Sequence, residues 1–204
     1  MTTEETSPSN DQVESSSPTE KACDEEWRKY RSNFPSISYM TSKELVQQED
    51  KVMLVDVRTD AEQKVSMIPN SMTFEEWKQN ELPKLIQADA DDSSKKADNN
   101  KIVFYCTIGY RSGVEAKKFQ DAYPDLKFYS LDGIVPYTQL GLPLVERNQT
   151  NKEEQPKETN RVHVFGPAWS KFANPEFDVV IFSKTKFLME GIAVKFKQFF
   201  GGTK

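Results

Sequence analysis

The segment from Cys106 to Ser112 brings a thiol, a glycine and an arginine into close succession. It follows an apolar run at 102–105 and precedes a stretch of helical pattern. We therefore expect it where a buried strand ends and a helix begins. Free N–H groups and the positive end of a helix dipole favour the thiolate form of a thiol placed there. Gly109 allows the positive φ that turns N–H groups inward around an anion, and Arg111 adds a permanent cation. The pattern predicts an anion-binding loop with a nucleophilic sulfur at its base.

The elements that must position this loop can be read from the apolar pattern. Three short apolar runs each end at a polar residue or a cysteine: Val52–Val55, Ile102–Tyr105 and Lys127–Leu131. Runs that are apolar on both faces are typical of buried strands in a parallel sheet. Helical stretches lie between them, and we expect Ser42, Thr73 and Ser112 as their N-caps. Strands that alternate with helices predict an α/β fold, with a central, mostly parallel sheet flanked by helices on both faces.

Composition excludes several classes of site. The chain has 204 residues with two cysteines and one histidine, His163, so neither a multi-cysteine zinc site nor a two-histidine metal motif is available. We expect no metal. Residues 1–26 carry eight acidic residues and one basic residue, so the net charge of −5 leaves about +2 for the rest, which argues against nucleic-acid binding. Apolar runs are too short for a membrane-spanning helix. With no targeting pattern visible, we expect a cytoplasmic location, where Cys23 would be a free thiol.

The chain divides by composition into four parts. Residues 1–33 are acidic and poor in apolar residues, and we expect a disordered tail there. Residues 34–147 form the α/β domain, which contains an exposed loop at 89–100. Residues 148–160 are polar and are interpreted as a linker. Residues 161–204 form a C-terminal extension, with strands expected at 161–165 and 177–182, His163 as a structural residue in the first of them, and an amphipathic helix from 184 to 200.

The amphipathic helix has three interpretations. Packing on the domain is preferred because such helices usually bury their apolar face. Docking of a partner comes second. Contact with an anionic membrane surface comes third, and it is suggested by lysines such as Lys195 and Lys197.

The loop resembles the active-site loop of the rhodanese family of sulfurtransferases, whose signature is Cys-x-x-Gly-x-Arg-Ser. Other family segments follow in order between Ser36 and Val145. They are Leu54-Val55-Asp56-Val57-Arg58, Ile68-Pro69, Leu131-Asp132-Gly133 and Gly141-Leu142-Pro143. The chain departs from the family pattern at Ser66-Met67, Asn70-Ser71, Ile134 and Tyr137. These departures affect turns and packing and leave the loop itself intact. The resemblance implies a rhodanese-like fold with the C-terminal extension added to it.

What the resemblance implies for function is ping-pong transfer of sulfane sulfur. The Cys106 thiolate would take the outer sulfur of a donor such as thiosulfate as a persulfide. A thiol, a thioredoxin-like protein or cyanide would then accept it. The N–H groups of the loop would hold the persulfide; the residues concerned are Thr107, Ile108, Gly109, Tyr110 and Ser112. Arg111, with Arg58, would attract the anionic donor. Asp56 and Arg58 are more typical of a structural ion pair. No cofactor is implied, and we expect a monomer.

Two alternatives stay open at this point. Cysteine-dependent phosphatases have a similar loop with five residues between cysteine and arginine, but four residues separate Cys106 from Arg111. The shorter loop suits a sulfur atom better than a tetrahedral phosphate. The second alternative is a rhodanese-like interaction module without catalysis, because a fold does not imply an activity. In that case Cys106 would be an ordinary buried thiol.

Overall fold

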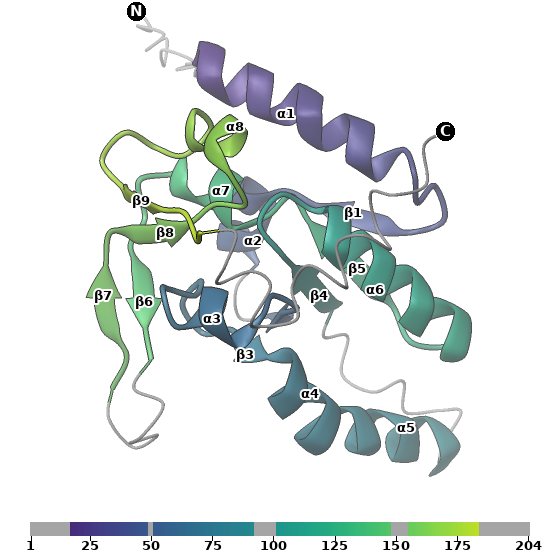
Figure 1. Ribbon diagram of the computed structural model, residues 1–204. Coiled ribbons are helices and arrows are strands. Elements are labelled where there is room, and N and C mark those ends of the chain that lie inside the picture. Colours follow the sequence, from purple (N-terminus) through teal and green to yellow (C-terminus); the bar gives the residue numbers. More distant parts are fainter. Residues whose placement is uncertain (1–16, 49–50, 92–100, 148–154, 184–204) are drawn as a thin grey trace, which may run out of the picture.

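A computed structural model describes residues 17–48, 51–91, 101–147 and 155–183 (Figure 1). Its centre is a five-stranded sheet in which all neighbouring strands run parallel, in the order β1-β5-β4-β2-β3. The strands are β1 (Ser38–Met40), β2 (Val52–Asp56), β3 (Met72–Thr73), β4 (Lys101–Tyr105) and β5 (Phe128–Leu131). The predicted parallel sheet is confirmed, and the three apolar runs form β2, β4 and β5.

Helices cover both faces of this sheet, as predicted. The helices of the domain are α2 (Ser42–Gln47), α3 (Asp60–Gln63), α4 (Phe74–Asn80), α5 (Leu82–Asp91), α6 (Tyr110–Ala122) and α7 (Ile134–Thr138). Side chains alternate along a strand, so neighbours in β4 enter different cores. Phe104 packs with Trp77 of α4 and Phe119 of α6. Tyr105 packs with the side that holds α2 and α7.

The expected N-caps are confirmed at one position and wrong at two. Thr73 caps α4 and accepts a hydrogen bond from the Glu76 N–H at 3.2 Å. The cap of α2 is Thr41, one residue before the predicted Ser42. The cap of α6 is Gly109, with φ +88°, so this helix starts earlier than the predicted cap at Ser112. Glycine can take this left-handed conformation without steric cost, and the helix therefore begins directly after the loop.

The prediction of a disordered tail over residues 1–33 is wrong for its second half. Pro18–Arg31 forms helix α1, which contacts α6 and α7 (Figure 1). The Ser17 and Glu20 side chains make a capping box at its start. Cys23 and Trp27, one turn apart, bury their side chains against the domain, each 5% exposed. Two buried anchors outweigh the polar composition of the rest. Residues 1–16 lie outside the described residues.

The C-terminal part packs onto the domain. Strand β7 (Lys157–Thr159) pairs antiparallel with β6 (Leu144–Glu146), so the prediction of a linker over 148–160 is wrong at its end. This strand is largely exposed, and its pairing needs only backbone groups, so its polar composition did not reveal it. Strands β8 (Arg161–His163) and β9 (Asp178–Val180) pair parallel, and α8 (Pro167–Ser170) lies between them.

The strands predicted at 161–165 and 177–182 are thus present in shorter form. Of the loop predicted at 89–100, residues 89–91 end α5 and the others lie outside the described residues. The predicted helix at 184–200 also lies outside them. Within the described part of the chain, no helix is long and apolar enough to cross a membrane.

Candidate active site

Cys106 lies directly after β4 and is 1% exposed. The loop that it opens is held from one side by the N-terminus of α7. The N–H of Ile134 donates to the Cys106 carbonyl at 2.9 Å, and that of Val135 donates to the Thr107 carbonyl at 3.1 Å. Gly133 has φ +126°, and a Cβ there would lie 2.5 Å from the Thr107 carbonyl oxygen. The backbones can therefore approach this closely because residue 133 is glycine.

The other side of the loop rests on helix α1. A Cβ on Gly109 would lie 2.8 Å from Cδ1 and Nε1 of Trp27. The indole ring thus lies directly against the loop glycine that caps α6. Composition could not reveal this contact, because 82 positions separate the two residues in the sequence. Helix α1 is therefore part of the site's support.

The sulfur of Cys106 faces a chain of hydroxyl groups. The Ser112 Oγ lies 3.7 Å from Cys106 Sγ, at donor distance, and 2.9 Å from Ser130 Oγ. Ser130 in turn donates to the Gly109 carbonyl at 3.3 Å. The first intrahelical bond of α6 runs from the Gly113 N–H to the Gly109 carbonyl, so the first-turn N–H groups lie outside the helix ladder. Ser112, predicted as a cap, is instead a donor to the sulfur.

Arg111 does not stand as an uncompensated cation. Its Nη1 and Nη2 donate to the two carboxylate oxygens of Glu62 in α3, each at 2.7 Å, and Nη2 also donates to Thr107 Oγ1 at 3.1 Å. Burial by itself would raise the pKa of Glu62, but the charge and hydrogen bonds of Arg111 hold it well below its ordinary value. The prediction that Arg111 attracts the anionic donor is therefore not supported by this geometry, because a carboxylate already neutralises its charge.

Glu62 also binds its own helix terminus and the C-terminal extension. Its Oε2 accepts from the Thr59 N–H at 3.0 Å. His163 of β8, fully buried, places Nδ1 3.2 Å from Glu62 Oε1. Burial lowers the pKa of His163 below its ordinary value, although Glu62 acts in the opposite direction. The net effect favours the neutral imidazole. Sequence reasoning predicted a structural histidine, and no sequence signal pointed to its partner Glu62.

Asp56 and Arg58 form the structural ion pair that the sequence predicted. Both side chains are fully buried, and Arg58 Nη2 lies 2.7 Å from Asp56 Oδ2. The same nitrogen donates to the Ser66 carbonyl at 2.6 Å. Among the described residues Arg58 does not line the cavity at Cys106. It therefore orders the segment after β2, and the suggestion that it attracts the donor is not supported.

A cavity of about 30 Å³ lies over the sulfur. Its lining residues are Cys106, Thr107, Ile108, Tyr110, Arg111, Phe165 and Trp169. Two of these, Phe165 and Trp169, come from the C-terminal extension and cover the sulfur. The ring centroid of Tyr30 in α1 lies 5.6 Å from that of Tyr110 and 5.8 Å from that of Trp169. Helix α1 therefore packs against the aromatic residues that line this cavity. Gly109 and Ser112 are not among its described lining residues.

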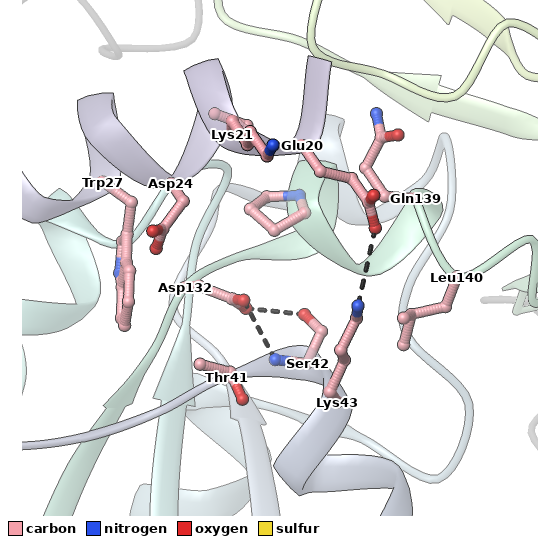
Figure 2. A pocket seen from close by; sticks show the side chains of 12 residues that line it. Glu20, Lys21, Asp24, Trp27, Thr41, Ser42, Lys43, Asp132, Gln139 and Leu140 are labelled. Atoms are coloured by element: carbon pink, nitrogen blue, oxygen red, sulfur yellow. Dashed lines mark hydrogen bonds and ion pairs between the residues drawn. The ribbon is translucent and has the colours of Figure 1, made fainter. Parts of the chain in front are cut away.

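A second, larger cavity of about 230 Å³ lies between α1 and the domain (Figure 2). At its base the Asp132 carboxylate accepts from the Ser42 N–H at 2.9 Å and the Ser42 hydroxyl at 2.6 Å. Figure 2 also shows the Glu20 side chain of α1 pointing at Lys43 of α2. Glu20 Oε1 lies 3.7 Å from Lys43 Nζ. Burial raises the pKa of Asp132 to about 7 and that of the Cys23 thiol to about 12. Cys23 is thus a buried neutral thiol at neutral pH.

The order of the strands, the Cys106 loop and the α/β layers together define a rhodanese-type fold. Residues 41–135 match the family described as "Rhodanese-like domain", and this part of the chain is a rhodanese-like domain. No curated protein matches the chain. The fold expectation, including the family, is thereby confirmed.

Three solved structures illustrate the similarity. A thiosulfate sulfurtransferase from Pseudomonas aeruginosa has 17% identity and a TM-score of 0.43, over 62% of this chain and 22% of that one. A human single-domain sulfurtransferase has 22% identity and a TM-score of 0.33, over 46% and 89%. A protein of unknown function from Rhodopseudomonas palustris, described as a possible tyrosine phosphatase, has 22% identity and a TM-score of 0.38, over 65% and 98%. This chain thus spans less than a quarter of the Pseudomonas protein, and similarities at this level carry no information on the reaction.

Proposed function

We propose that this protein is a sulfurtransferase that carries sulfane sulfur as a persulfide on Cys106. The observation that supports the proposal is the cavity over the sulfur. At about 30 Å³ it has room for a water-sized group, and therefore for an added sulfur atom. The hydroxyl of Ser112 and the first turn of α6 lie beside it and suit a negatively charged sulfur.

The proposed reaction has two steps. The Cys106 thiolate attacks the outer sulfur of a donor such as thiosulfate. A new S–S bond forms at Cys106, the S–S bond of the donor breaks, and sulfite leaves with the bonding electron pair. A thiolate or cyanide then attacks the outer sulfur of the persulfide, and the Cys106 thiolate is regenerated. A thiol or a thioredoxin-like protein is the proposed acceptor, and no cofactor is needed for either step.

The phosphatase alternative fits less well. The loop arginine already binds Glu62 through both Nη groups and does not offer them to an oxyanion. One observation favours the second alternative, an interaction module without catalysis. Cys106 is 1% exposed, so Phe165, Trp169 and the other residues that line its cavity leave a donor little access to the sulfur.

Mass spectrometry of the intact protein separates these functions. After incubation with a sulfane donor, we expect a mass gain of one sulfur atom at Cys106, which cyanide removes as thiocyanate. Cys106→Ser should show no gain, and Cys23→Ser should behave like the wild type because Cys23 is buried in another cavity. If neither thiosulfate nor an organic thiosulfonate adds sulfur to Cys106, the proposed function is wrong and the interaction module is favoured.

A further inference from the structure

The charges around Cys106 are poorly suited to an inorganic dianion. Among the described residues that line its cavity, Arg111 is the one charged side chain, and Glu62 neutralises it through two hydrogen bonds of 2.7 Å. Arg58, the other arginine to which the family resemblance gave the role of attracting the donor, is fully buried against Asp56. Thiosulfate would therefore bring two negative charges to a site whose described cations are already compensated. Removing such an anion from water without a counter-charge is strongly unfavourable.

The walls of the site are apolar and largely aromatic. Tyr110, Phe165 and Trp169 surround the cavity together with Ile108. The rings continue beyond the cavity, since Trp169 lies 5.7 Å from Phe172 and 5.8 Å from Tyr30 between centroids. A donor body that displaces part of this cover breaks ring contacts. An aromatic or other apolar body can restore them, whereas a sulfonate group cannot.

The lining of the cavity determines what a bound donor contacts. Phe165 and Trp169 line it together with Cys106, so a donor whose terminal sulfur reaches Cys106 lies against these two side chains. We propose that Phe165 and Trp169 make the enzyme selective for sulfane donors with an apolar, preferably aromatic, body over inorganic thiosulfate. This inference rests on the proposed function and specifies its substrate class.

An arenethiosulfonate represents this class. The Cys106 thiolate attacks its terminal sulfur and forms the Cys106 persulfide. The S–S bond of the donor breaks, and the arenesulfinate leaves with the electron pair. One thiolate and one thiosulfonate give one persulfide anion and one sulfinate, so charge and sulfur balance without an oxidant or a reductant.

The test compares three donors: benzenethiosulfonate, methanethiosulfonate and thiosulfate. The first two share the reacting group and the single charge and differ in the body, while thiosulfate adds a second charge. The rate of persulfide formation on Cys106 with each donor is divided by the rate at which the same donor reacts with glutathione. This division corrects for the intrinsic reactivity of the donor toward a thiol. We expect kcat/KM to favour benzenethiosulfonate over methanethiosulfonate by about tenfold or more, the range that an apolar pocket gives. Thiosulfate should be the poorest donor.

Variants of the cover identify the residues responsible. In Trp169→Ala the ratio of kcat/KM for benzenethiosulfonate to that for methanethiosulfonate should fall below about threefold, because the aromatic partner of the donor is lost. Phe165→Leu, which keeps an apolar side chain, provides a second test if Trp169→Ala does not fold. Ile181→Ala is the matched control: it removes an apolar side chain of the same extension that is 43% exposed, and the ratio should not change.

The outcomes are distinct. The inference is overturned by any of three results: a wild-type ratio near one, a ratio that is unchanged in both Trp169→Ala and Phe165→Leu, or thiosulfate as the best donor. In each case persulfide formation on Cys106 would still support the proposed function. Failure of all three donors to add sulfur to Cys106 overturns the proposed function itself, and the inference with it.

Discussion

The guanidinium of Arg111 and the carboxylate of Glu62 meet in two hydrogen bonds of 2.7 Å, although 49 positions separate the residues in the sequence. The pair joins the first turn of α6 to helix α3, and His163 of the extension contacts the same carboxylate at 3.2 Å. The arginine of the loop signature therefore serves here to fix the loop to two other parts of the fold.

Glu62→Gln should lower the free energy of unfolding by about 3–5 kcal/mol, because the change leaves the largely buried Arg111 without its counter-charge. Urea unfolding at neutral pH measures the loss. Glu75→Gln is the control, since Glu75 is exposed in its ion pair with Lys78 and its removal should change stability by less than about 1 kcal/mol. Equal losses in the two variants would show that the Glu62 pair does not support the fold.

Gly133→Ala should destabilise the protein by about 2 kcal/mol more than Gly141→Ala. Both glycines have positive φ, so both substitutions carry a conformational cost. At Gly133 the new Cβ would also lie 2.5 Å from the Thr107 carbonyl oxygen, whereas at Gly141 no heavy atom lies within 4 Å. Unfolding curves and the rate of persulfide formation on Cys106 measure the two consequences. The idea that α7 fixes the loop fails if both alanine variants lose the same stability and keep the same rate.

Cys23 should resist iodoacetamide in the folded protein. Burial raises the pKa of its thiol to about 12, and the side chain is 5% exposed. At a pH of about 8 very little thiolate is present, and the reagent has almost no access. Peptide mapping should find Cys23 unlabelled in the native protein and labelled after unfolding in urea. Labelling at equal rates in both states would mean that α1 does not bury this residue against the domain.

Asp132 should make stability depend on pH with an unusual sign. Burial raises the pKa of its carboxyl to about 7 in the folded state, from its ordinary value of 3.8. Between these values the folded state keeps a proton that the unfolded state releases. The carboxyl's contribution is thus largest below a pH of about 4 and is lost as the pH rises to about 7, by at most about 1.4 kcal/mol per pH unit.

Urea unfolding of wild type and Asp132→Asn across this range isolates the effect from other carboxyl groups. The stability of the wild type relative to this variant should decline as the pH rises from about 4 to about 7. The exposed residue Asp125, changed to Asn, controls for the removal of a negative charge. Parallel curves for wild type and Asp132→Asn would contradict the raised pKa of Asp132.

The sheet and the Cys106 loop could be predicted because their signals are local. Apolar runs produce β2, β4 and β5, and the position of Cys106 after one of these runs places it at the carboxyl edge. The cap at Thr73 is also local, because the side chain and its partner Glu76 are three residues apart. Such features depend on neighbours in sequence, which a single chain displays.

The support of the site could not be predicted, because it depends on contacts between distant segments. Helix α1 is polar in composition, and two buried residues, Cys23 and Trp27, anchor it against the domain. The sequence around Glu62 does not by itself indicate that this residue pairs with Arg111. Phe165 and Trp169 look like ordinary apolar residues of an extension until the fold brings them over Cys106. In each case tertiary contacts decide the outcome, and local pattern does not encode them.

The parallel pairing of β8 with β9 limits how the site can open. A parallel pair requires the connecting chain to return to its starting level, so the segment that carries Trp169 is tied down at both ends. It is also fastened in between, because Gln139 donates to the Phe172 carbonyl and the Asn174 N–H donates to Thr138 Oγ1 at 3.1 Å. Access to Cys106 would then require the Phe165 and Trp169 rings to rotate within this frame. Under the proposed function, a sulfur on Cys106 would be shielded from other nucleophiles between encounters.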